Sequence, residues 1–131
     1  MPGEGLEVRT ATASELPTVL SILDAAMLQT DASAVRRRIE DAVLVAVEEG
    51  RILGACVVES ERTPAEVVAI AVRPGRRGQG IGTALLETAT GRWGRLAVEF
   101  DDGARPFYAA LGFEIETVEA GRCRGVWTGS E

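Results

Sequence analysis

Hydrophobic and polar residues change their spacing several times along the chain, and each change predicts a different element. Residues 6 to 12 alternate in polarity as a half-buried strand does. After Ser14, which we expect to be the N-cap, apolar residues recur every three or four positions and predict an amphipathic helix, with Pro17 tolerated in its first turn. The apolar face of this helix comprises Leu16, Val19, Leu20, Leu23 and Met27. A second, shorter helix is expected over about residues 32 to 41.

The middle of the chain predicts strands. Residues 42 to 60 form two apolar runs separated by Glu49 and Gly50, a pair suited to a tight hairpin turn because glycine readily adopts a positive φ. A third antiparallel strand is expected over residues 65 to 72. A helical pattern follows, and then a buried strand over residues 95 to 100. Because a strand, a helix and a second strand make a crossover unit, these last two strands should be parallel neighbours.

The end of the chain predicts a short helix and a hairpin. Asp101 or Asp102 would open the helix, and Gly112 would close it as a left-handed residue. Residues 113 to 119 and 122 to 128 would then pair as the final hairpin. The expected fold is a single-domain α+β mixed sheet with the element order β-α-α-β-β-β-α-β-α-β-β.

The composition is that of one ordinary globular domain. Hydrophobic residues make up 46% of residues 1–131 and charged residues 26%. The sequence contains no apolar run of about 18 residues and does not begin as a secretory signal does, so we expect a cytoplasmic protein without a membrane partner. Cys56 and Cys123 lack metal-ligand spacing, and two partly buried thiols are favoured over a disulfide.

Three residue types are missing from the sequence, and their absence excludes several kinds of chemistry. The chain has 14 arginines but no histidine, lysine or asparagine. Catalysis by a Ser-His or Cys-His pair, a histidine zinc site, a lysine Schiff base and a P-loop lysine are therefore excluded, and we expect no metal. The net charge of −6 argues against nucleic acid as a partner. Arginine without lysine suits a salt-rich cytoplasm and a GC-rich genome equally.

Between the strand ending at Val72 and the next helix, the chain carries three arginines and a run of alternate glycines. Glycines at 78, 80 and 82 allow a sharp turn with exposed N–H groups, where a positive φ would cost another residue about 1–2 kcal/mol. A helix start carries unpaired N–H groups and the positive end of the helix dipole. Arg76 and Arg77 add positive charge. We therefore favour a diphosphate site over a merely flexible loop.

The spacing of this loop selects among phosphate-binding motifs. The dinucleotide motif G-x-G-x-x-G is not met, because Thr83 stands where its third glycine would be. What does match is R-x-x-G-x-G, which spans residues 77 to 82 as "RGQGIG". With this motif, and with "ARPFYAALGFE" later in the chain, the sequence resembles the GNAT superfamily of acyl-CoA-dependent N-acetyltransferases. The element order agrees with that family from residue 6 to the end.

The resemblance implies a sheet splayed between its fourth and fifth strands, with acetyl-CoA as the cosubstrate. In such a site, backbone groups of Ile70 and Val72 pair with the pantetheine arm, and an amide near Ile70 polarises the thioester carbonyl. The chain departs from the family pattern at Asp101, where asparagine is usual. The CoA pyrophosphate would be held by the loop amides of Arg77, Gly78, Gln79, Gly80, Ile81, Gly82 and Thr83.

Three side chains are candidates for proton transfer. Tyr108 matches the family tyrosine whose hydroxyl reaches the CoA sulfur; the alternative is a core tyrosine that is hydrogen-bonded locally. Phe107 and Leu111 are expected to anchor the helix to the core and to leave Tyr108 tilted towards the cleft. Glu66, which matches the place of a family base, and Glu99, which interrupts an apolar strand, are candidate general bases. For each glutamate, a solvated charge is the alternative.

These features predict an N-acetyltransferase in which a primary amine attacks the thioester directly. A non-catalytic acyl-CoA-binding regulatory module and a nucleotide-binding domain of another type are the alternatives. The acceptor could be a small molecule, a peptide or a protein, and the acidic balance mildly favours a cationic amine. A homodimer formed through a sheet edge or hairpin is compatible with the sequence.

Overall fold

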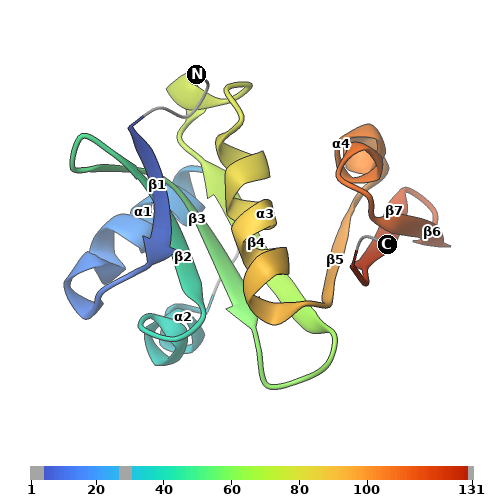
Figure 1. Cartoon of the computed structure of the whole chain (residues 1–131), viewed down its shortest axis with the longest axis horizontal. Helices are drawn as coiled ribbons and strands as arrows, with labels where there is room; N and C mark the ends of the chain where they lie inside the picture. The colour runs from blue at the N-terminus through green and yellow to red at the C-terminus, as the bar shows by residue number, and fades with distance from the viewer. Residues whose placement is uncertain (1–4, 27–30, 130–131) are drawn as a thin grey trace.

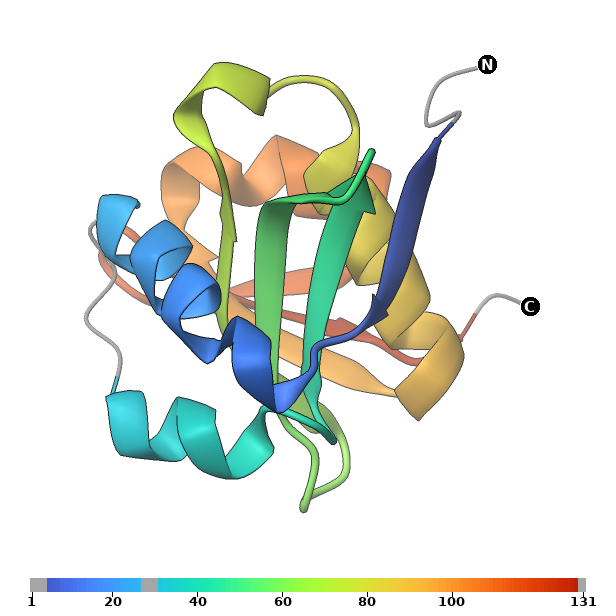
Figure 2. The same cartoon turned by 90° about the vertical axis from the view of Figure 1, so that its left-hand side faces the viewer.

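The computed structural model describes residues 5–26 and 31–129, which form one seven-stranded mixed sheet with helices on both faces (Figures 1 and 2). The sheet order is β1-β2-β3-β4-β5-β7-β6. The strands are β1 (Leu6–Thr10), β2 (Val43–Glu48), β3 (Arg51–Glu59), β4 (Ala65–Val72), β5 (Leu96–Asp101), β6 (Glu114–Glu119) and β7 (Arg122–Trp127). The helices are α1 (Leu16–Ala25), α2 (Ala32–Arg38), α3 (Ile81–Trp93) and α4 (Arg105–Ala110), with 3-10 turns at Ala13–Glu15, Pro74–Arg76 and Asp102–Ala104.

The expected element order and fold class are confirmed, and the differences lie at element ends. The first strand ends at Thr10, and the N-cap of the first helical turn is Thr12 rather than Ser14. The backbone N–H of Thr12 donates to Glu15 Oε1 at 2.9 Å, so a glutamate three residues along provides the cap contact. The expected apolar contact of Met27 lies outside the described residues.

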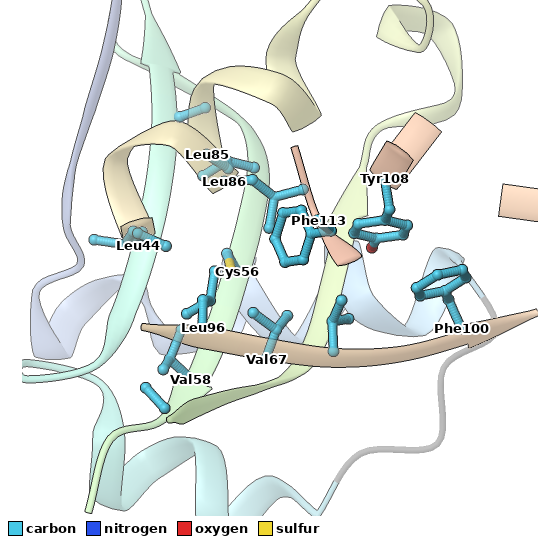
Figure 3. Packing of buried hydrophobic residues seen from close by; sticks show 14 of the residues in the cluster. Leu44, Cys56, Val58, Val67, Leu85, Leu86, Leu96, Phe100, Tyr108 and Phe113 are labelled. Carbon is cyan, nitrogen blue, oxygen red and sulfur yellow. The ribbon is translucent and has the colours of Figure 1, made fainter. Parts of the chain in front are cut away.

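Two hydrophobic layers cover the two faces of the sheet. Helices α1 and α2 pack on one face, and α3 packs on the other (Figure 2). The layer under α3 and α4 includes Leu85, Leu96 and the aromatic rings shown in Figure 3. The layer under α1 and α2 includes Val19 and Leu23. The sheet therefore separates an α3 face from an α1/α2 face.

The sheet opens between its two central parallel strands, as the family resemblance implied. Strands β4 and β5 pair in parallel at only three positions, from Ala65 opposite Leu96 to Val67 opposite Val98. Beyond them β5 bends away and carries α4, β6 and β7 with it (Figure 1). The second half of β4 therefore has β3 as its strand neighbour on one side only.

A bulge in β4 divides this strand into two halves. Val57 on β3 faces Ala69, but Val58 faces Val67, so Val68 is an extra residue on β4. Before the bulge, Ala65 and Val67 point to the α3 face; after it, Ala69 and Ala71 belong to the layer under α1 and α2. Ile70 and Val72 consequently pack towards α3, beside the open part of the sheet.

The two cysteines are both free and fully buried in the layer under α3, which confirms thiols rather than a disulfide. Burial raises the pKa of the Cys56 thiol to about 12. In the part of the chain that the structure describes, no helix is long and apolar enough to cross a membrane.

Candidate functional site

A cavity of about 730 Å³ lies where β4 ends and α3 begins. Its walls come from the second half of β4, the glycine loop, the first turn of α3 and the edge of α4. The lining residues are Ala26, Ile70, Ala71, Val72, Arg76, Arg77, Gly78, Gly80, Ile81, Gly82, Thr83, Ala104 and Phe107. Every cofactor-binding residue predicted from the sequence lines this cavity except Gln79, which is exposed.

The glycine loop presents its amides without internal partners. From Arg77 to Thr83, no backbone N–H donates a hydrogen bond to any described residue. Gly78 and Gly80 have φ values of 78° and 85°, in the left-handed region that only glycine adopts without strain. A Cβ on either glycine would meet no atom within 4 Å, so the backbone on that side is open. The helix start therefore presents unpartnered N–H donors of the kind that an anion can accept from.

Two neighbouring arginines at this loop make different contacts. Arg76 Nη2 donates to Glu48 Oε1 at 2.6 Å, and its Nε donates to Gln79 Oε1 at 2.7 Å. Arg77 Nε donates to the carbonyl oxygen of Val72 at 3.2 Å. Among the described residues Arg77 has no carboxylate partner. Its charge is the one left available to the cavity.

Strand β4 turns the backbone groups of alternate residues towards the open side of the sheet. The N–H of Arg73 donates to the carbonyl of Leu53 on β3 at 2.8 Å, and Val72 faces Gly54. Because bonding directions alternate along an antiparallel pair, Ile70 and Val72 direct their N–H and C=O groups away from β3. On that side β5 no longer pairs with β4 beyond Val67. These groups can therefore bond an extended ligand as a missing strand would.

Tyr108 lies in the core rather than on the cavity wall. Its ring stacks on Phe100 with centroids 4.3 Å apart and meets Phe113 edge-on (Figure 3). The side chain of Tyr108 is 5% exposed, whereas Phe107 is 40% exposed and lines the cavity. The expected packing, with Phe107 as the anchor and Tyr108 tilted outwards, is thus reversed, because Tyr108 is the residue that stacks on Phe100 of β5.

The environment of Tyr108 keeps its phenol protonated. Burial, and secondarily the Cys56 thiol, raises the pKa of Tyr108 to about 12. The hydroxyl makes no hydrogen bond to a described residue, so the locally bonded tyrosine that was the alternative is not observed. At neutral pH this group can donate a proton or a hydrogen bond, but it cannot act as a base.

Glu66 and Glu99 come together on the α1/α2 face and share Arg124 of β7. Arg124 Nη1 lies 3.2 Å and 3.3 Å from the two carboxylate oxygens of Glu66. The same nitrogen lies 3.6 Å from Glu99 Oε2. Neither carboxylate is therefore an isolated solvated charge. The described residues include no group of three or more candidate metal ligands.

The sequence did not identify Arg124, Phe107 or Ala104 as site residues. Arg124 lies 58 residues from Glu66 in the chain, and strand pairing alone brings them together. The alternation of the last strand could have placed Arg124 on one face, but its partner could not be read from spacing. Phe107 was instead expected to anchor its helix to the core.

A family model for the GNAT acetyltransferase domain matches residues 40–115. The chain therefore belongs to the GNAT acetyltransferase family, which confirms the resemblance noted from its glycine motif. The matched range contains both glutamates, Tyr108 and the whole cavity loop. None of the curated proteins compared with the chain matches it.

Solved structures share this fold at low sequence identity. Rv2747 from Mycobacterium tuberculosis, solved in complex with CoA, has a TM-score of 0.77 at 19% identity over 95% of this chain and 99% of that one. The Escherichia coli ribosomal-protein-S18-alanine N-acetyltransferase has a TM-score of 0.74 at 17% identity, covering 92% and 90%. N-acetylglutamate synthase from Neisseria gonorrhoeae, complexed with coenzyme A, has a TM-score of 0.78 at 15% identity over 92% of this chain, which spans only 34% of that protein.

Proposed function

We propose that this protein transfers an acetyl group from acetyl-CoA to a primary amine, which attacks the thioester directly. The observation that carries the proposal is the row of unpartnered amides from Arg77 to Thr83, placed next to the open edge of β4. A pyrophosphate suits the first feature and an amide-containing pantetheine arm suits the second. Structures similar in fold, among them those of Rv2747 and of N-acetylglutamate synthase, were solved with CoA.

The residues present fit acetyl-CoA. The loop amides and Arg77 would hold the pyrophosphate by charge-assisted hydrogen bonds. Ile70 and Val72 would pair through their backbone groups with the pantetheine arm. Acetyl-CoA supplies an activated acyl carbon when bound, and the cavity of about 730 Å³ is large enough to enclose part of such a ligand.

The chemistry needs two proton movements. The nitrogen of a neutral amine forms a bond to the acyl carbon, and the carbon–sulfur bond then breaks. A carboxylate, Glu66 or Glu99, takes the proton that the nitrogen loses, and the protonated phenol of Tyr108 supplies a proton to the departing sulfur. A backbone N–H near Ile70 polarises the carbonyl, which requires no charged side chain.

The charge of the chain supports a cationic amine as the acceptor. The chain carries a net charge of −6, and two of the acidic side chains lie together on the α1/α2 face. Such a surface attracts a cationic amine, with an attraction screened over about 8–10 Å in physiological salt.

Calorimetry and a turnover assay test the proposal. Acetyl-CoA should bind to the wild-type protein, whereas ATP and NAD should not. A panel of small-molecule, peptide and protein amines, followed by release of free thiol, should then identify an acceptor. Tight binding of acetyl-CoA without thiol release from any amine would favour the non-catalytic binding module, and binding of ATP or NAD instead would favour a nucleotide-binding domain.

A further inference from the structure

We propose that Arg124 gives the two glutamates different roles. It forms an ion pair with Glu66, in which each side chain positions the other, and it leaves Glu99 to act as the general base. This inference rests on the proposed acetyl transfer and assigns the base that the proposal leaves between two residues. Arg124 acts only through the glutamates and is not a catalytic residue.

The two carboxylates are held unequally. Both oxygens of Glu66 lie within 3.3 Å of Arg124 Nη1, and the Glu66 side chain is only 15% exposed. Glu99 approaches the same nitrogen with one oxygen, at 3.6 Å, and its side chain is 49% exposed. Glu66 is therefore the more buried and the more closely paired of the two carboxylates. Glu99 keeps open acceptor positions that can receive a proton.

The position along the strands also favours Glu99. The last parallel pair joins Val67 to Val98, so Glu99 is the first residue of β5 beyond the pairing and lies level with Val68. At about 3.3 Å per residue, this level is roughly 7 Å along β4 from Ile70, whereas Glu66 is roughly 13 Å away. Along the strand direction, Glu99 is therefore closer than Glu66 to the level of the amide expected to polarise the thioester.

Both glutamates point to the same face of the sheet, opposite α3. Val98 and Phe100 belong to the layer under α3, so Glu99 between them points to the opposite face. Glu99 faces Arg124 directly across β5 and β7, which places the two side chains on the same side of the sheet. Glu66 reaches the same guanidinium and therefore lies on that face as well.

The charges around the pair explain why Arg124 is needed. Glu66 on β4 lies directly opposite Glu59 on β3, and like charges in that position repel. Glu59 is neutralised from the other side by Arg38 at 3.3 Å, and Arg124 does the same for Glu66. Two carboxylates, Glu66 and Glu99, thus share one guanidinium, which lies closer to Glu66 than to Glu99.

The proton balance of the step is simple. The amine nitrogen bonds to the acyl carbon and becomes positively charged, and the Glu99 carboxylate takes its proton. The carbon–sulfur bond breaks, and the sulfur takes the proton of Tyr108. Proton exchange with water restores both side chains.

Turnover of four variants at saturating acetyl-CoA tests this division. Glu99→Gln should lower kcat by about 10²–10⁴-fold with unchanged KM for acetyl-CoA. Glu66→Gln should release Arg124 to close on Glu99 and lower kcat by about tenfold. The double variant Glu66→Gln/Arg124→Gln should have a higher kcat than Glu66→Gln alone. Glu116→Gln is the matched control, because Glu116 faces Arg124 across β6 and β7 without an ion pair to it, and its kcat should remain at the wild-type value.

Other turnover results would overturn the proposal. If Glu66→Gln alone removes turnover, the double variant stays equally low and Glu99→Gln is near wild type, Glu66 is the base. If the double variant has a lower kcat than Glu66→Gln alone, Arg124 has only a structural role.

Melting temperatures test the pairing without an acceptor. The losses caused by Glu66→Gln and Arg124→Gln should not add, whereas those of Glu99→Gln and Arg124→Gln should add. The reverse pattern overturns the assignment of Arg124 to Glu66. Failure of the proposed function is distinct: the wild-type protein would release no thiol with any amine, and the assignment of Glu99 as a base would fail with it, whatever the melting temperatures show.

Discussion

Arg76 is tied to Glu48, with Nη2 and Oε1 2.6 Å apart, so the start of the glycine loop is fixed to the end of β2. Through Gln79, the same guanidinium also holds the middle of the loop. Arg77, next along the chain, bonds only a backbone carbonyl among the described residues. Two arginines that look equivalent in the sequence therefore make different contacts: Arg76 is held by Glu48 and Gln79, and Arg77 has no carboxylate partner among the described residues.

The first prediction tests this difference between the two arginines by calorimetry. Arg77→Gln should weaken acetyl-CoA binding by about tenfold, because it removes a charge-assisted contact worth at least about 1.5 kcal/mol. The double variant Glu48→Gln/Arg76→Gln removes a pair without net charge, so its Kd should change only because the loop loosens, and by less than that of Arg77→Gln. A larger effect of the double variant than of Arg77→Gln would contradict the assignment.

The second prediction concerns Gly82, which lines the cavity without a positive φ. A Cβ at Gly82 would lie 3.7 Å from Phe107 Cζ, an ordinary contact, so Gly82→Val should fold. The larger side chain would fill space on the cavity wall and weaken acetyl-CoA binding by more than about tenfold. Gly91→Val is the control, because Gly91 lies in the same helix away from the cavity and should leave the Kd unchanged.

The third prediction concerns the hydroxyl of Tyr108. Tyr108→Phe keeps the ring that stacks on Phe100 and loses only the proton donor. Turnover should fall by about 10²–10⁴-fold, while the Kd for acetyl-CoA and the melting temperature stay near wild type. Free-thiol release and calorimetry on the same preparations check both parts. Unchanged turnover would exclude a role as general acid.

The fourth prediction is a pH dependence at the start of the first helix. Glu15 accepts from Arg9 at 2.8 Å and 3.0 Å, and the arginine contact lowers the pKa of Glu15 from 4.5 to about 2. A depressed pKa contributes stability that is present above about pH 4.5 and lost as the pH falls towards 2. At pH 7, Glu15→Gln should lower the free energy of unfolding by about 1 kcal/mol.

Thermal melts between pH 2 and pH 7 measure the contribution of Glu15. The difference between wild type and Glu15→Gln should shrink as the pH falls from 4.5 and vanish near 2. A difference that is constant over this range would show that the carboxylate charge does not contribute.

The parts of the fold that depend on local chemistry could be predicted from the sequence. The β4 range, 65 to 72, was correct because an apolar run meets turn residues at both ends. Gly112 does close α4 with a φ of 96°, since a left-handed position favours glycine. The glycine loop was also located from glycines, because they adopt a positive φ without strain.

The features that the sequence did not predict depend on contacts between segments that are distant in the chain. The choice between Tyr108 and Phe107 as the core residue depends on where Phe100 of β5 lies, which the helical stripe alone does not contain. The pairing of Arg124 with Glu66 requires the β4-β5-β7 order. The bulge at Val68 leaves no mark in the sequence, because one more valine in an apolar run fits either register.

The extra residue Val68 limits which changes in the length of β4 the protein can tolerate. Since Val68 reverses which side chains face inward, deleting it would exchange the roles of every residue from Ala69 to Val72: two alanines would turn towards α3, and two larger side chains would be forced under α1. The two halves of β4 thus alternate out of phase because of one extra residue. Neither half can change its register without disrupting the packing of the other.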